Sequence, residues 1–446
     1  MKKLLLSIAL VSGITLVWAQ SVSLCPLNLS TITGLAEELS APAHDVLWTG
    51  IVGTNGSGNF YNSKKFAVTT DAGNTFRIDS VPEPDERGFT CIWAQDSLTA
   101  WAGLQDINGV YGGAIWKTTD GGHSWTRQTT TSQFAGGYLD YVAFFTPDSG
   151  VAFADPNGGY YEIYTTTDGG TSWSRVPQSN IPPGLSGEFG LYGNHNSAAQ
   201  NGVWCVTNLG RVYYSHDRGY HWQVVTVKPL LWSTFTDVSM TDSLHGAACE
   251  PPWQDSIWVT ADGGATWTTH LLPIVASRVS AIKSIPGAFV YKDPGSGIYA
   301  TTDNFNTNFP ITTNAANLGE WGLLMYDATI GWSDAASPVS DSAMVKISNV
   351  VTGISNCNTL SNVSSLTVFP NPVETGYALV SFQLKKDGDV KLCLLDISGK
   401  ELKTQIEKGK NGSNAVVFDF KNISPGLYLL KLDDGRNYSV SKVIIK

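Results

Sequence analysis

The chain has 446 residues, a formal net charge of −10 and only 15% charged residues. This length predicts more than one domain. The acidic balance argues against a nucleic-acid partner, because binding phosphates requires a basic surface. The 45 Gly and 15 Trp favour an all-β fold with many tight turns.

Residues 1–19 have the pattern of a secretory signal peptide. Lys2 and Lys3 precede the apolar run 4–17, and the small residue Ala19 offers a cleavage point. No later stretch approaches the roughly 20 apolar residues that a membrane-spanning helix needs. The sequence therefore predicts an exported protein without a transmembrane segment.

One motif recurs between residues 69 and 307. It has the form Thr-x-Asp-x-Gly-x-Ser/Thr-Trp, and consecutive copies lie 41–49 residues apart. A period of 40–50 residues is typical of propellers and other repeat arrays. Aspartate accepts backbone hydrogen bonds in a tight turn, glycine adopts positive φ, and the aromatic residue packs between sheets. We therefore assign a structural role to the six aspartates, which are Asp71, Asp120, Asp168, Asp217, Asp262 and Asp303.

Each copy is flanked by alternating strands, so that one repeat contains four strands and forms one blade. A last unit, at 321–326, 329–333 and 343–348, has three strands and lacks the motif. The mature N-terminus near 22–29 would supply the fourth strand and close the ring, which removes exposed sheet edges. We expect a seven-bladed β-propeller over residues 20–355, and six or eight blades remain alternatives.

The composition changes after residue 363. Residues 21–363 contain 14 Lys and Arg against 29 Asp and Glu, whereas residues 364–446 contain 12 against 9. The later stretch contains five alternating strands separated by turn residues such as those at 386–388 and 424–426. The expected strands are 377–384, 390–395, 415–420, 426–431 and 438–445. This pattern predicts a small Ig-like β-sandwich at 366–446, joined to the propeller by a linker at 356–365.

The recurring motif resembles the Asp-box, or BNR, repeat family. That resemblance implies that each box joins the third and fourth strands of a blade and lies opposite the ligand face. The whole propeller is similar to the sortilin-like and photosystem-assembly-factor-like propellers, or to one half of a xyloglucanase. It departs from sialidases, because only Arg87 and Arg278 are placed for a three-arginine carboxylate site.

The C-terminal segment resembles the type A sorting domain of the type IX (Por) secretion system. The resemblance rests on four segments, namely Phe369-Pro-Asn-Pro372, Asp396-Ile-Ser-Gly-Lys400, Ile423-Ser-Pro-Gly-Leu-Tyr428 and Lys442-Val-Ile-Ile-Lys446. It implies a Bacteroidota-type cell and engagement with the type IX machinery through residues 366–446. The protein would then be secreted or attached to the outer-membrane surface.

Candidate site residues lie in the loops at the face opposite the boxes. Aromatic faces stack on sugar rings, and two suitably spaced carboxylates can hydrolyse a glycosidic bond. Acids at loop starts also commonly satisfy turn backbone groups. The candidate catalytic acids are Asp155, Glu250 and Asp293. The candidate ligand-binding residues are Arg87, Tyr138, Glu188, Trp232, Trp253, Arg278 and Glu320.

We interpret the protein as a propeller that recognises a glycan or a surface protein without catalysis. A glycoside hydrolase that uses these carboxylates is the alternative, and an assembly or scaffold role is a third. We predict no cofactor and no metal, because the His residues are isolated and no HExxH motif occurs. Cys25 and Cys357 could form a disulfide; otherwise the six cysteines are unpaired or partly paired core thiols.

Overall fold

The computed structural model divides the chain into two compact units, Met1–Val350 and Val351–Lys446. It describes residues 21–25, 34–54, 60–83, 87–106, 112–227, 237–249, 255–283, 285–293, 295–312, 318–335, 344–348, 363–374, 376–396, 401–433 and 438–446. The predicted signal peptide and Cys357 lie outside these residues. Four of the described cysteines, which are Cys91, Cys205, Cys249 and Cys393, are buried free thiols.

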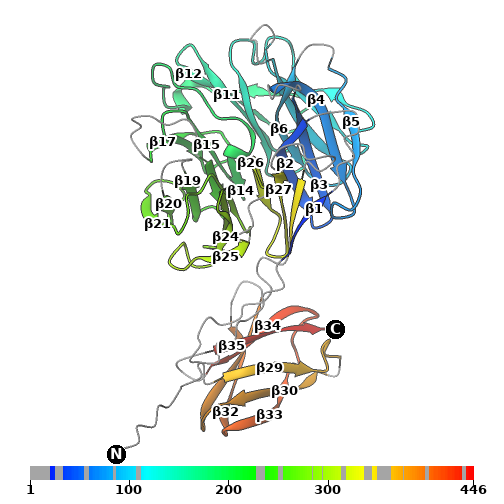
Figure 1. The fold of residues 1–446 in the computed structure, drawn as a ribbon, viewed down its shortest axis with the longest axis vertical. Helices are drawn as coiled ribbons and strands as arrows, with labels where there is room; N and C mark the ends of the chain where they lie inside the picture. The colour runs from blue at the N-terminus through cyan, green and yellow to red at the C-terminus, as the bar shows by residue number, and fades with distance from the viewer. Residues whose placement is uncertain are drawn as a thin grey trace, which may run out of the picture. The chain divides into compact units, whose positions relative to one another are not determined.

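The first unit contains seven four-stranded antiparallel sheets, as expected for a seven-bladed propeller. Figure 1 shows them around a central axis, with β2 and β26 near the middle and β5, β17 and β21 near the rim. Blades 1 to 3 are β2 (Gly34–Ala43) to β5 (Arg77–Ser80), β6 (Gly88–Ala94) to β9 (Thr126–Arg127) and β10 (Leu139–Phe144) to β13 (Ser174–Arg175). Their middle strands are β3 (Val46–Thr54), β4 (Phe60–Thr69), β7 (Ala100–Gln105), β8 (Ala114–Thr118), β11 (Gly150–Asn157) and β12 (Tyr160–Thr166).

Blades 4 to 6 repeat this order. They are β14 (Ser197–Ala199) to β17 (Gln223–Thr226), β18 (Asp237–Met240) to β21 (Thr268–Leu271) and β22 (Arg278–Ala281) to β25 (Phe309–Thr312). Their middle strands are β15 (Gly202–Val206), β16 (Arg211–Ser215), β19 (Gly246–Cys249), β20 (Ser256–Thr260), β23 (Phe289–Asp293) and β24 (Gly297–Thr301). Two short 3-10 helices, η1 (Gln178–Asn180) and η2 (Gly193–His195), lie between blades 3 and 4.

Blade 7 combines the two ends of the propeller sequence. It contains β26 (Leu318–Met325), β27 (Ile330–Ala335), β28 (Met344–Ser348) and, as its outer strand, β1 (Ser21–Cys25). β1 runs antiparallel to β28, with Ser21 opposite Ser348 and Cys25 opposite Met344. The prediction that an N-terminal strand closes the ring is confirmed.

Each Asp box joins the third and fourth strands of its blade, as the resemblance implied. In blade 3, Thr166 Oγ1 and Ser172 N donate to Asp168 Oδ1 at 2.8 and 2.9 Å, and Ser172 Oγ donates to Oδ2 at 2.6 Å. Gly170 N donates to Thr166 Oγ1 at 3.0 Å. Hydrogen bonds from Ser172 stabilise the charged carboxylate, which lowers the pKa of Asp168.

The box also packs its blade against the preceding one. Gly219, in the box of blade 4, has φ +90°, and a Cβ there would lie 2.5 Å from Val151 Cγ2 in blade 3. The ring of the box residue Trp222 lies 5.4 Å from the ring of Phe153, also in blade 3. The turn therefore fixes the local chain direction and one edge of the interface between blades.

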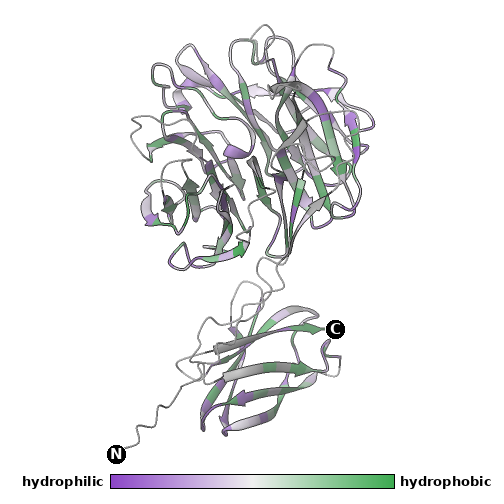
Figure 2. Cartoon of the chain, viewed as in Figure 1, coloured by the Kyte–Doolittle hydropathy of each residue, from purple (hydrophilic) through white to green (hydrophobic). Residues whose placement is uncertain are grey.

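The second unit has two sheets with a shared apolar core. One contains β29 (Val363–Phe369), β30 (Tyr377–Leu384) and β33 (Gly412–Asp419). The other has the order β32 (Glu401–Gly409), β31 (Gly388–Leu395), β34 (Gly426–Asp433) and β35 (Tyr438–Ile445). Leu392, Phe418 and Leu430 are fully buried between them. In Figure 2, green apolar residues alternate with purple polar ones along these strands.

We expect Gly219→Ala to destabilise the protein by about 1–3 kcal/mol, because it adds both a positive-φ cost and a clash with Val151. Gly158→Ala is the matched control, since Gly158 has φ +70° but nothing within 4 Å of a Cβ. Urea denaturation of both variants measures the difference. Equal losses would show that the close approach to blade 3 contributes nothing.

Candidate functional site

A cavity of about 630 Å³ occupies the axis of the propeller. The first strand of every blade contributes to its wall, mainly through the last residues of each strand and the turn that follows. Because the third strand runs parallel to the first, these turns lie on the same face as the Asp boxes. We call this hollow the channel cavity and this side the box face. Its wall includes Ser40, Trp93, Phe145, Ser239, Lys283 and Tyr326.

A belt of serines joins the inner strands around the cavity. Ser40 Oγ accepts a hydrogen bond from Ala94 N in the next blade at 2.9 Å. Ser197, Ser239 and Ser280 accept from the next blade in the same way, at 3.0, 2.9 and 2.9 Å. Each bond satisfies a backbone donor that would otherwise face the channel. The serines also line the channel cavity, where Ser40 and Ser239 are partly exposed and Ser197 and Ser280 are buried.

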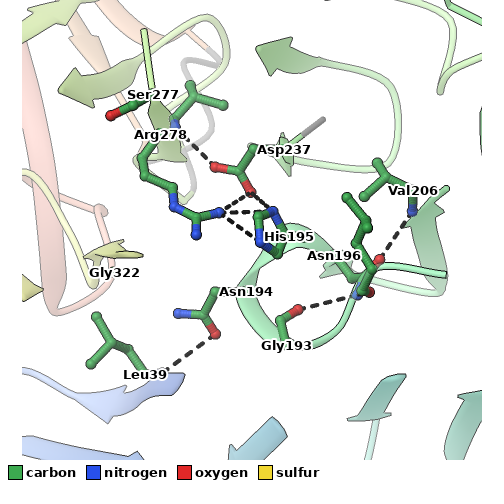
Figure 3. Close-up of polar contacts among 12 residues, drawn as sticks. Leu39, Gly193, Asn194, His195, Asn196, Val206, Asp237, Ser277, Arg278 and Gly322 are labelled. Atoms are coloured by element: carbon green, nitrogen blue, oxygen red, sulfur yellow. Dashed lines mark hydrogen bonds and ion pairs between the residues drawn. The ribbon is translucent and has the colours of Figure 1, made fainter. Parts of the chain in front are cut away.

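The segment η2 crosses the channel and closes its far end. Asn194 N donates to Glu38 Oε2 of blade 1 at 3.0 Å. Leu39 N of the same blade donates to Asn194 Oδ1 at 3.4 Å (Figure 3). Gly193 has φ +58°, and a Cβ there would lie within 2.0 Å of the Glu38 carboxylate. Asn194 and Asn196 line the cavity from this side and form its floor.

Below this floor, His195 lies in a buried charged cluster (Figure 3). Arg278 donates to His195 Nδ1 at 2.7 Å, and Asp237 Oδ1 lies 3.8 Å from the same nitrogen. Val279 N donates to Asp237 Oδ2 at 3.0 Å. Burial raises the pKa of Asp237 to about 6, although Arg278 opposes the shift. The predicted ligand residue Arg278 is thus engaged with protein groups and is 6% exposed.

Two other predicted ligand residues form buried ion pairs. Arg87 NH1 lies 2.9 Å from Glu83 Oε1, and both side chains are buried. Arg211 NH1 lies 2.7 Å from Glu188 Oε2 in blade 4. These contacts hold loop segments of the opposite face onto their blades.

The remaining ligand candidates are not brought together. Tyr138 is half-buried, and its ring centroid lies 6.4 Å from that of Tyr192. Glu320 lies in β26, and its side chain is outside the described part of the structure. Trp232 and Trp253 are outside the described residues, as is the candidate acid Glu250.

Asp155 lies near the end of β11 in blade 3, and Asp293 ends β23 in blade 6, and their surroundings differ. Asp293 accepts a hydrogen bond from Gly295 N at 3.1 Å within a turn. Asp155 is half-buried, accepts from Gly190 N at 2.7 Å, and burial raises its pKa to about 6. Its neighbour Asp140 is buried with neither carboxylate oxygen bonded within the described structure, and burial, together with the nearby carboxylate of Asp155, raises the pKa of Asp140 well above its usual range. Asp140 is 1% exposed and does not face a substrate.

The sequence-based reasoning missed the box-face cavity. The first-strand turns carry an acid after the strand, as at Asp242 and Asp327, and these acids accept backbone N–H groups within the turn. Large residues that line the cavity, such as Trp93, Phe145 and Tyr326, lie one to three positions before the acid of their turn. This second repeat was the available signal. Among the described residues that line the channel cavity, Asp327 is the sole acid.

A metal site is not apparent in the part of the chain that the structure describes. There, no group of three or more His, Cys, Asp or Glu side chains is arranged to hold an ion. His221 and His245 instead pair with nearby aspartates of their own turns, at 2.6 and 2.9 Å.

The second unit matches a known family. Residues 367–446 match the secretion system C-terminal sorting domain, and the match runs from within β29 to Lys446. The C-terminal unit is a type IX sorting domain. This sorting domain indicates secretion across the outer membrane, to the cell surface or the extracellular medium. It implies engagement with the type IX machinery.

No curated protein matches the chain. Among solved structures, "YCF48 bound to D1 peptide" has 12% identity and a TM-score of 0.53, covering 76% of this chain and 97% of that one. YCF48 from Cyanidioschyzon merolae has 15% identity and a TM-score of 0.51, covering 74% and 98%. The GH74 enzyme of Niastella koreensis has 16% identity and a TM-score of 0.47, covering 94% and 67%. The YCF48 likenesses establish the propeller fold alone.

The described residues contain no helix that is long and apolar enough to cross a membrane.

We expect Lys292→Met to destabilise the propeller by about 3–5 kcal/mol, because it leaves a buried charge uncompensated. Lys292 Nζ lies 2.5 Å from Asp334 Oδ1 and also donates to Ser333 Oγ and Gly319 O, and the ion pair is fully buried. The double variant Lys292→Met/Asp334→Leu should recover most of the loss. Thermal unfolding measures the stability of both variants. A double variant that is as unstable as Lys292→Met alone would contradict the charge argument.

Asp155→Asn should stabilise the protein at pH 8 by about 2 kcal/mol, after a discount for partial solvent access. A raised pKa means that the folded state binds the proton more tightly than the unfolded state. The stability contribution of Asp155 is therefore complete below about pH 4 and is lost as pH rises through about 6. Denaturation at pH 4 and pH 8 checks this. A gain that is the same at both values would indicate a packing effect.

Proposed function

We propose that this exported propeller recognises an extracellular glycan in the channel cavity, without catalysis. The observation that carries the proposal is the cavity itself, an axial hollow of about 630 Å³ whose far end is crossed by η2. This volume falls within the usual range of small-ligand sites. Its rim combines the partly exposed aromatic residues Trp93, Phe145 and Tyr326 with serine hydroxyls, a mixture suited to sugar rings.

The described residues of this wall contain no pair of acids, which supports recognition over hydrolysis. Glycosidases place two carboxylates on either side of the scissile bond. Asp327, the acid that lines the channel cavity, has Oδ1 engaged by Thr329 N and Ile330 N. Asp242, in an adjoining hollow of about 540 Å³, is engaged by its own turn and by His245.

One observation favours a hydrolytic alternative at the opposite face. Asp155 is partly accessible and has a pKa raised to about 6, as a general acid requires. Its neighbour Asp140 is buried, so a second carboxylate would have to come from elsewhere. Recognition of a protein segment is the other alternative, since a propeller of this fold is known with a bound peptide.

The test is a glycan array with the full exported chain, with release of reducing ends assayed on every hit. We expect binding without release, and an increase of at least 10-fold in Kd for Trp93→Ala and Tyr326→Ala, because large aromatic residues dominate binding energies. Tyr220→Ala is the control, since Tyr220 is an exposed box aromatic outside the cavity.

Other outcomes separate the alternatives. Release that is abolished by Asp155→Asn would replace recognition by hydrolysis. Glycan binding that is unaffected by Trp93→Ala and Tyr326→Ala would contradict the channel cavity as the site. Failure of every glycan to bind would reject glycan recognition.

A further inference from the structure

The lysine at the rim of the channel cavity has no counter-ion in the described structure. Lys283 follows β22, and its side chain is exposed. Within the described residues its ammonium makes no ion pair or hydrogen bond, and it lies over the Trp93 ring, whose centroid is 5.8 Å away. A cation held over an aromatic face is attracted to the ring but keeps its hydrogen-bond donors available.

Lys283 stands where two hollows meet. The channel cavity and the adjoining hollow share Trp93, Phe144, Phe145, Ala198 and Lys283. A ligand that fills either hollow therefore lies next to the ammonium and the Trp93 ring. This position makes the pair a candidate determinant of which ligand is accepted.

The wall around Lys283 offers hydrogen-bond donors. Each of the four belt serines uses its oxygen to accept a backbone N–H, and none of them donates a described hydrogen bond. The hydroxyl hydrogens of Ser40 and Ser239, which are partly exposed, remain for a ligand. The carboxylates nearest the rim, Asp242 and Asp327, accept N–H groups of their own turns through Oδ1, and neither forms a described ion pair with Lys283. The ammonium and the two hydroxyls therefore suit a ligand that supplies acceptors and a negative charge.

We infer that the channel cavity binds the end of an acidic glycan chain, with a uronic acid carboxylate on Lys283 and an adjacent sugar face on Trp93. The floor formed by Asn194 and Asn196 prevents a chain from threading through, so the site takes an end. The excess of acids in the propeller disfavours a polyanion, and we therefore assign one carboxylate to the ammonium. This inference rests on the proposed function and specifies its ligand class.

The experiment compares trisaccharides that carry one terminal glucuronic, mannuronic or galacturonic acid with their carboxyl-reduced neutral counterparts. Titration calorimetry with the full exported chain gives the Kd of each. We expect at least one acidic trisaccharide to bind 10-fold or more tightly than its neutral counterpart. Lys283→Gln should remove that preference, Lys283→Arg should keep most of it, and Lys65→Gln, outside the cavity, should leave it unchanged. Added salt should weaken the binding of the acidic ligand only in proteins that carry Lys or Arg at position 283.

Each other result overturns the inference in a distinguishable way. Equal binding of acidic and neutral sugars, lost in Trp93→Ala, would keep glycan recognition and reject the carboxylate. An acidic preference that survives Lys283→Gln would assign the carboxylate to another group. Binding of an acidic hexapeptide but of no saccharide would reject glycan recognition together with the inference.

Discussion

The propeller depends on a carboxylate that closes a turn between two strands. The decayed copy in blade 6 isolates this interaction, because it has lost its glycine and its tryptophan. Asp303 still accepts from Thr307 N and Thr307 Oγ1 at 2.8 and 2.7 Å. Asn304 and Phe305 adopt φ of +55° and +65°, and the Phe305 ring stacks on Phe289 at 5.1 Å. The hydrogen bonds therefore hold the turn even where the backbone conformation is costly for the residues present.

Local and periodic features of the fold were predictable from the sequence. The box and its spacing follow from the recurring motif, and the N-terminal strand of blade 7 follows from the strand that the last unit lacks. Five sandwich strands follow from the alternation of apolar and polar residues. The strand β32 was missed because it lies at a sheet edge and is largely exposed, so its residues Glu401, Lys403 and Lys408 show no apolar face. β29 begins at Val363, inside the segment that was expected to be linker.

The site was less predictable because propeller blades each contribute one or two residues to the axis. Ser40 and Ser280 belong to one belt but are separated by most of the propeller sequence, and no local pattern marks them as neighbours. Conversely, Arg87 and Glu188 look like mouth residues in the sequence but are buried against Glu83 and Arg211. A charged residue at a strand end has the same sequence pattern whether it faces solvent or closes an ion pair, and only the fold separates the two.

The closed channel gives the two faces of the propeller different physical roles. On one side of η2, charges such as Arg278 and Asp237 are buried, and their mutual contacts fix the segment that blocks the axis. On the other side, turn acids such as Asp327 hold the rim by accepting backbone hydrogen bonds. Ligand specificity on the box face then depends on the side chains that lie between those turns. Trp93 and Lys283 can change there without loss of the hydrogen bonds that build the blades, which separates ligand choice from stability.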